Sequence, residues 1–155
     1  MKKSKSVRNF KSFTESLINI VYKKTIDEDR TTITAYDGTT KVGSIIIEIL
    51  YNAYYEFDDV LDEDEFDELY PDNEIVKIEH IEVLDTYKNK GIGSDLMKRG
   101  IKLMKSKGYE QFYLNASPMG FSGLDTQDLV DFYEKFGFRI LLDQGHNVLM
   151  SITKI

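Results

Sequence analysis

A strand that runs directly into a glycine turn and a helix is the feature that most constrains this fold. Residues 74–84 carry apolar side chains at both parities, as in a strand that is buried on both faces. Lys90-Gly91-Ile92-Gly93 follows at once, and the next residues show helical apolar spacing that ends at Gly108. We therefore expect a central strand whose carboxyl end leads through a tight turn into a helix.

The rest of the chain predicts further elements around this unit. In chain order they are a helix at 7–24, strands at 31–35 and 41–51 joined by a turn at 37–38, a loop or short acidic helix at 56–72, a strand at 111–115, a helix that ends at 137, and strands at 138–142 and 147–153. This order predicts an α/β (α+β) fold with one mixed central β-sheet and helices on both faces. Residues 1–155 are expected to form a single domain.

The composition excludes several kinds of site. The chain of 155 residues has no Cys and only two His, which excludes disulfides and leaves too few ligands for a tetrahedral zinc site, so no metal is expected. No apolar run approaches the roughly 20 residues of a membrane span. No apolar signal segment follows the basic first residues, so we expect a cytoplasmic protein that does not associate with membranes.

The charge is unevenly distributed. The net charge is -7, and the segment from Glu56 to Glu74 contains acidic residues but neither Lys nor Arg. Overall acidity argues against a nucleic-acid partner, because such binding needs a broad basic face. The acidic segment has two interpretations, a solvated loop that aids solubility or a surface that attracts a cationic ligand or a partner protein. A homodimer is compatible with the sequence.

The glycine turn has the character of an anion site. Glycines allow a ligand to approach the backbone closely, and the free N–H groups of a first helical turn favour negative charge. The turn does not fit a Walker A loop or the dinucleotide-binding pattern, because the Gly-Lys-Ser/Thr end and the third glycine are missing. The alternative is a tight strand–helix connection with no ligand.

Two segments together resemble the signature of the GNAT superfamily of acetyl-CoA-dependent N-acetyltransferases. The first runs from Val83 to Met97 and resembles the family's Arg/Gln-x-x-Gly-x-Gly/Ala loop, with Lys88 at the Arg/Gln position and Asp85 where the family often has Pro. The second, Tyr133-Glu134-Lys135-Phe136-Gly137-Phe138, resembles the family's Tyr-x-x-x-Gly-Phe. The resemblance covers residues 76–142, and the first 70 residues match only in the order of elements.

This resemblance implies a sheet that splays at its central strand and a site for acetyl-CoA as cosubstrate. The pantetheine arm would bond to backbone near Ile81 and Val83. The pyrophosphate would lie on the turn and the first helical residues, which are Lys88, Asn89, Lys90, Gly91, Ile92, Gly93 and Ser94. The implied reaction moves an acetyl group to a primary amine by direct attack in a ternary complex, without a metal. The acceptor would be cationic, such as a polyamine, an aminoglycoside or a lysine-bearing protein. The alternative is a catalytically silent GNAT-fold protein that binds CoA or a partner protein through its acidic face.

The resemblance also implies catalytic residues. Tyr133 occupies the position of the acid that protonates the departing thiolate, and the alternative is a tyrosine that packs in the core. Glu79 is the candidate base, since strand alternation predicts that it shares a face with Ile81 and Val83, and burial there would raise its pKa. The alternative is an ion pair between Glu79 and a lysine. Glu82 and His80 are weaker candidates on the opposite face.

Two further polar residues are candidates for cofactor contacts. Asn115 ends a predicted strand, where it would bond the pantetheine or the acceptor, or instead cap the following loop. Thr126 lies seven residues before Tyr133, where the family commonly has Asn. It offers a hydroxyl to the ligand or caps the helix, with Asp125 as the competing cap.

Overall fold

The computed structural model describes residues 19–71, 74–117, 125–145 and 147–153, and all structural statements concern these residues. The elements in chain order are β1 (Ile20–Asp27), β2 (Arg30–Asp37), β3 (Thr40–Tyr51), the 3-10 helix η1 (Ala53–Glu56), α2 (Glu63–Leu69), β4 (Glu74–Val83), the 3-10 helix η2 (Asp85–Tyr87), α3 (Ile92–Ser106), β5 (Phe112–Ala116), α4 (Thr126–Glu134), β6 (Arg139–Asp143) and β7 (Val148–Ile152).

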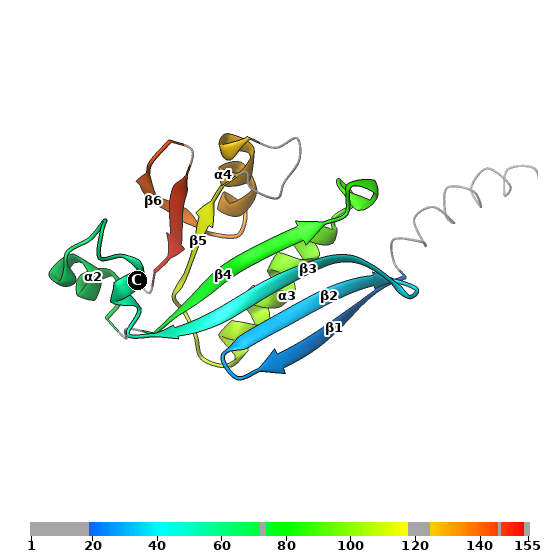
Figure 1. Cartoon of the computed structure of the whole chain (residues 1–155), viewed down its shortest axis with the longest axis horizontal. Helices are drawn as coiled ribbons and strands as arrows, with labels where there is room; N and C mark the ends of the chain where they lie inside the picture. The colour runs from blue at the N-terminus through cyan, green and yellow to red at the C-terminus, as the bar shows by residue number, and fades with distance from the viewer. Residues whose placement is uncertain (1–18, 72–73, 118–124, 146, 154–155) are drawn as a thin grey trace, which may run out of the picture.

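The strands form one seven-stranded sheet with the order β1-β2-β3-β4-β5-β7-β6 (Figure 1). Neighbouring strands are antiparallel except for the central β4–β5 pair, which is parallel because α3 connects the two strands. The sheet is therefore mixed, as expected from the order of elements.

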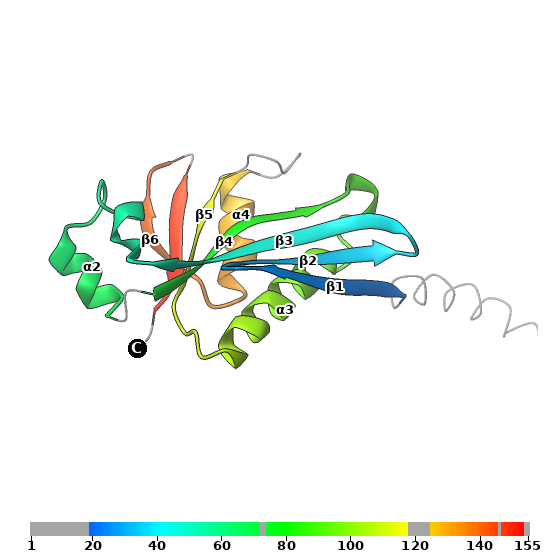
Figure 2. The same ribbon diagram turned by 60° about the horizontal axis from the view of Figure 1, so that its bottom comes forward.

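Helices cover both faces of the sheet, and each face has its own core. Residues of α3 and α4, such as Leu96 and Leu129, pack with Ile45 and Ile78 of the sheet in one buried cluster. A second cluster lies on the other face, where Phe57 and Phe66, from the η1–α2 segment, cover β5 and β7. Figure 2 shows α3 along one side of strands β1 to β4 and α2 beyond the end of the sheet. The other side of strands β1 to β4 carries no helix from the described part of the chain, and we call it the open face.

The central strand contains a β-bulge. Ile47 pairs with Ile78 and Ile46 pairs with His80, so Glu79 is an extra residue in β4. Such an insertion shifts the alternation of side chains by one. As a result Ile78 and Ile81, three residues apart, both belong to the core beneath α3.

The central strand also separates from its parallel neighbour. β4 pairs with β3 along almost its whole length, whereas Val76 and Lys77 alone, among the described residues, pair with β5. Beyond Lys77 the two strands diverge, as Figure 1 shows for the green and yellow arrows. The sheet is therefore splayed at its central strand, in agreement with the expectation.

One predicted element is wrong in its described part. Residues 20–24 belong to strand β1 and not to the helix predicted at 7–24, whose first twelve residues lie outside the described residues. Val21 fitted helical spacing, but the stretch is rich in β-branched and aromatic residues and pairs along its length with β2. Ile20 and Tyr22, at a spacing of two, pack against the core.

The other predicted strands and helices are confirmed. At most of their ends the predicted and the observed bounds differ by no more than two residues. The acidic segment takes the helical form of its two alternatives, with Asp62 as the N-cap of α2 in a capping box with Glu65. The turns at Asp37-Gly38 and Gln144-Gly145 join their strand pairs as expected. Within the described part of the chain, no helix is long and apolar enough to cross a membrane.

Close packing of α3 on the sheet depends on Gly43 in β3. A Cβ added at Gly43 would lie 2.9 Å from the backbone oxygen of Glu82 in β4 and 3.3 Å from Cδ1 of Leu96 in α3. The first contact is with backbone, which cannot rotate away. Gly100, on the facing side of α3, would meet mainly the flexible end of Ile47, at 2.7 Å.

We expect Gly43→Ala to lower the free energy of unfolding by about 1–3 kcal/mol, because β3 and β4 must move apart. Gly100→Ala is the matched control, in which Ile47 can shift and helix propensity partly compensates. Urea unfolding of both variants measures the difference. A smaller loss for Gly43→Ala than for Gly100→Ala would contradict this account of the packing.

Candidate active site

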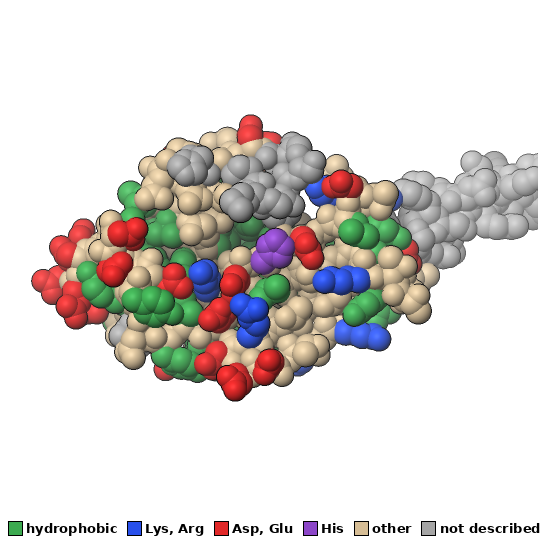
Figure 3. Space-filling model, in the orientation of Figure 1, with side chains coloured by type: hydrophobic (Ala, Val, Ile, Leu, Met, Phe, Trp, Pro, Cys, Tyr) green, Lys and Arg blue, Asp and Glu red, His purple; other side chains and the backbone are tan. Residues whose placement is uncertain are grey.

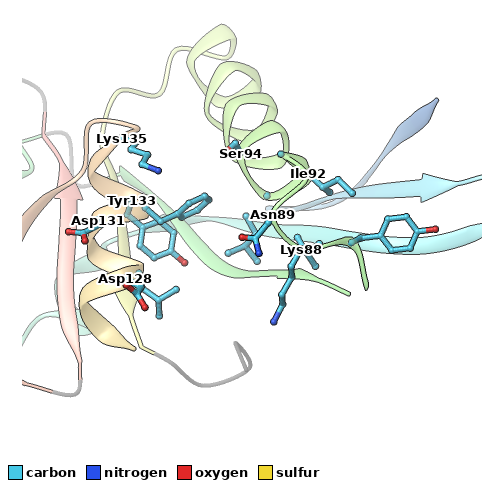
Figure 4. A pocket seen from close by; sticks show the side chains of 15 residues that line it. Lys88, Asn89, Ile92, Ser94, Asp128, Asp131, Tyr133 and Lys135 are labelled. Carbon is cyan, nitrogen blue, oxygen red and sulfur yellow. The ribbon is translucent and has the colours of Figure 1, made fainter. Parts of the chain in front are cut away.

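A cavity of about 790 Å³ opens where β4 leaves β5. The end of β4, the following turn, the start of α3 and one side of α4 line it. Figure 4 shows α4 and the start of α3 on opposite sides of this space. Its volume is typical of a site for a small molecule or cofactor.

The turn before α3 has the backbone geometry of a ligand cradle. Asn89 and Gly91 both have positive φ, 61° and 86°, and Gly91 is the N-cap of α3 without a side-chain capping bond. The amides at the start of the helix therefore keep their hydrogen-bonding capacity toward the cavity. Lys88 lines the cavity, and its Nζ lies 2.8 Å from Oδ1 of Asp85.

Glycine at position 93 keeps the cradle open. A Cβ there would lie 3.7 Å from Cζ of Phe132 in α4 and 3.8 Å from Cγ2 of Val83 in β4. These are ordinary contact distances, so a larger side chain would fill the space between α3 and α4 without breaking the fold. Ile92 and Ser94 line the same part of the cavity.

Tyr133 reaches the cavity from α4. Its side chain is only 5% exposed and its ring packs edge-on against Phe132 and Phe138. In Figure 4 its hydroxyl points away from α4 toward the turn that carries Asn89. Burial raises the pKa of Tyr133 to about 12, so the phenol remains protonated at neutral pH and is available as a donor.

The structure thus brings most of the predicted residues to one cavity. Those that line it are Ile81, Val83, Lys88, Asn89, Gly91, Ile92, Gly93, Ser94 and Tyr133. Lys90, Asn115, Thr126 and Glu79 are not among its lining residues. Asn115 is exposed in β5, and Asp125, not Thr126, is the N-cap of α4.

Glu79 lies on the open face, and the expectation that it shares a face with Ile81 and Val83 is wrong. The bulge in β4 shifts the alternation, so Glu79 is directed toward Arg30 of β2, with 3.0 Å between Nη2 and Oε2. The expected raised pKa is also wrong: a hydrogen bond with Glu48, and then the Arg30 charge, lower the pKa of Glu79. It forms an ion pair, as the alternative held, but with an arginine.

Sequence reasoning missed several lining residues from α4. Asp128, Leu129, Asp131, Phe132 and Lys135 all line the cavity. Their spacing of three and four residues places them on one side of the helix. This spacing was visible in the sequence, but the apolar members fitted a core face equally well. Within the described residues, no group of three His, Asp or Glu side chains is arranged to hold a metal ion.

The comparison with protein families identifies the family of this chain. A sequence model of the acetyltransferase (GNAT) family matches residues 3–138. The chain belongs to this family. Its GNAT signature, inferred from the glycine turn and the Tyr133 segment, is therefore confirmed.

Among curated proteins, this GNAT chain is similar to the uncharacterized N-acetyltransferase CgeE of Bacillus subtilis (strain 168). The two are 36% identical over 74 residues, which are 46% of this chain and 26% of the relative. The chain thus spans about a quarter of the length of that relative.

Solved structures share the fold. The PaiA N-acetyltransferase of Thermoplasma acidophilum, in complex with coenzyme A, has a TM-score of 0.56 and 21% identity over 81% of this chain and 62% of its own. A GNAT family acetyltransferase from Elizabethkingia anophelis, with acetyl-CoA bound, has a TM-score of 0.56 and 15% identity over 88% of this chain and 99% of its own.

We expect Tyr133→Phe to change the free energy of unfolding by less than about 1 kcal/mol. Among the described residues its hydroxyl has no hydrogen-bond partner, so the substitution breaks no bond and keeps the packed ring. Thermal and urea unfolding of the variant test this. A loss of several kcal/mol would mean that the hydroxyl has a structural role.

Proposed function

We propose that this GNAT chain is an N-acetyltransferase that transfers an acetyl group from acetyl-CoA to a primary amine by direct attack in a ternary complex. The observation that carries the proposal is the cavity at the N-terminus of α3. It combines glycine-turn amides, an exposed stretch of strand edge and a protonated tyrosine in one place.

The residues of the cavity fit acetyl-CoA in three respects. The positive-φ turn and the start of α3 offer amides to the pyrophosphate, and Lys88 supplies a cation nearby. The edge of β4 beyond Lys77 offers backbone groups near Ile81 and Val83 to the amides of the pantetheine arm. Gly93 keeps the space that a Cβ would fill.

Acetyl-CoA supplies the acetyl group as a thioester. The protein positions the two substrates and transfers the protons that the reaction requires. The acceptor nitrogen forms a bond to the acetyl carbon while the carbon–sulfur bond breaks. A base, with Glu79 as the candidate, first takes a proton from the ammonium, directly or through water, so that the neutral amine can attack. Tyr133 donates its proton to the departing sulfur, and the second proton that the nitrogen loses as the amide forms restores the phenol. Holding both substrates at the split of the sheet contributes much of the rate.

A cationic acceptor, such as a polyamine, an aminoglycoside or a lysine-bearing protein, is part of the proposal. The η1–α2 segment covers the same face of the sheet on which Glu79 lies, and its α2 carries the acids Glu63, Asp64 and Glu65 in its first turn. Such acids raise the local concentration of an ammonium substrate around this side of the sheet. The protein would work without a metal.

Calorimetric titration with acetyl-CoA, followed by a thiol-release assay against cationic amines, tests the function. We expect micromolar binding and amine-dependent release of CoA thiol. The chain has no Cys, so its own thiols give no background. Binding without turnover on any amine or protein would favour the catalytically silent alternative, and absence of binding would overturn the proposal.

The role of Tyr133 predicts that Tyr133→Phe lowers kcat about 100-fold while acetyl-CoA binding stays within about twofold. Loss of the donor affects the departing sulfur and leaves the cradle intact. Stopped-flow or steady-state thiol release measures kcat. Unchanged kcat would exclude Tyr133 as the acid.

The cradle predicts that Gly93→Ala weakens acetyl-CoA binding about tenfold, because the added methyl group narrows the space between Val83 and Phe132. Gly100→Ala is the same substitution two turns further along α3, outside the cavity, and serves as the control. Calorimetry compares the two dissociation constants. Equal weakening in both variants would point to a general disturbance of α3.

A further inference from the structure

Charged side chains from three neighbouring strands meet on the open face beside the split of the sheet. Figure 3 shows acidic and basic side chains intermixed over the middle of this face. Arg30 of β2 pairs across the sheet with Glu48 of β3, which in turn pairs with Lys77 of β4. The bulge adds Glu79 to this row, so two carboxylates lie side by side just where β4 leaves β5.

Arg30 holds the two carboxylates together. Its Nη2 lies 3.0 Å from Oε2 of Glu79 and 3.7 Å from Oε2 of Glu48. The side chains of both glutamates are about one third exposed, 33% for Glu48 and 34% for Glu79, so ligands and water can reach them. One guanidinium thus restrains a carboxylate pair that would otherwise repel itself.

The pair has a higher affinity for its first proton than a lone carboxylate. A hydrogen bond with Glu79, and then burial, raise the pKa of Glu48, whereas the hydrogen bond with Glu48 lowers the pKa of Glu79. The hydrogen bond between the two side chains thus shifts their pKa values in opposite directions, and their titrations are coupled.

We propose that Glu48 is a positioning residue for Glu79, and that the two side chains together accept the proton of the acceptor ammonium. This proposal rests on the proposed transferase function and deepens it. A general base is most effective when its pKa lies close to the working pH, and sharing the proton moves the pair in that direction. Glu48 acts through Glu79, which lies closer to the split.

Other charged groups around the pair set its working range. Arg30 and Lys77 both favour the ionised pair, which keeps it ready to accept a proton at neutral pH. Lys77 is also held by Glu56 of η1, with 3.4 Å between Nζ and Oε1. His80 and Lys41 pair with Glu82 further along β4, and not with Glu79.

The first test is independent of catalysis. In protein labelled with ¹³C at the glutamate carboxyl carbon, we expect the Glu48 resonance to titrate above the ordinary carboxyl range and the Glu79 resonance to follow the same step in part. In Glu48→Gln the Glu79 resonance should lose that shared step. Independent, single-step titration of Glu79 in the unchanged protein would overturn the pair.

The second test follows kcat/KM against pH for the best amine substrate. In the unchanged protein activity falls as the pair binds its first proton. We expect Glu48→Gln to lower kcat about tenfold at neutral pH and to move this acid limb to lower pH by about one unit, because a lone carboxylate is a weaker base. Glu74→Gln, at the opposite end of β4, is the matched control and should leave the profile unchanged.

The outcomes separate the two proposals. A lower kcat with an unmoved acid limb would mean that Glu48 has only a structural role, and this would overturn the inference while leaving the transferase function intact. If Glu48→Gln changes neither turnover nor the pH profile, the inference is also overturned and the transferase function stays intact. Absence of turnover in the unchanged protein, with acetyl-CoA and any cationic amine, would overturn the function and the inference together.

Discussion

The structure depends on the unequal hydrogen bonding of the two edges of β4. One edge is paired with β3 over the strand, and the other is paired with β5 only at Val76 and Lys77. Backbone N–H and C=O groups inside a folded domain need partners, so the free edge is costly unless water or a ligand satisfies it. The cavity lies along this edge, between β4 and α4. The site thus exists because β4 and β5 do not pair beyond Lys77.

Packing on each face of the sheet connects the strands on the two sides of the split. The core beneath α3 and α4 contains residues of β2 to β5 and of β7, and the aromatic cluster of the η1–α2 segment contains residues of β3, β4, β5 and β7. In that cluster the rings of Phe57 and Phe66 lie 5.4 Å apart, and those of Phe57 and Tyr113 lie 4.7 Å apart. Both clusters therefore connect strands on the two sides of the split, and closure of the split would require repacking on both faces of the sheet.

Much of the architecture could be predicted from the sequence because local patterns specify it. Three local patterns predict the same strand–turn–helix unit: the apolar run of β4, the glycine turn and the helical spacing of α3. The structure has this unit at the predicted residues. Strand β1 was missed because Val21 fitted a helical period, while the pairing with β2 that decides its state is a tertiary contact. The nine cavity residues were found through the family signature, whereas the side of α4 that faces them depends on how the helix packs.

The face on which Glu79 lies could not be predicted from the alternation of residues along β4. A period of two places every second residue of a strand on one face, and a single inserted residue breaks that rule without any mark in the composition. Glu48 was missed for a related reason, since its role depends on the register between β3 and β4 and on Arg30 in a third strand. Such relations across strands are not readable from the order of residues alone.

The bulge divides β4 into two segments. The alternation of side chains between the two faces of the sheet is offset by one residue from one segment to the next. Before it, the even-numbered Val76 and Ile78 face the helices, and after it the odd-numbered Ile81 does. Deletion of Glu79 would restore a regular strand in which His80, Ile81 and the residues after them keep their partners in β3 and their faces. The bulge thus adds one carboxylate to the open face, within reach of Arg30, without changing the face on which the cavity residues lie.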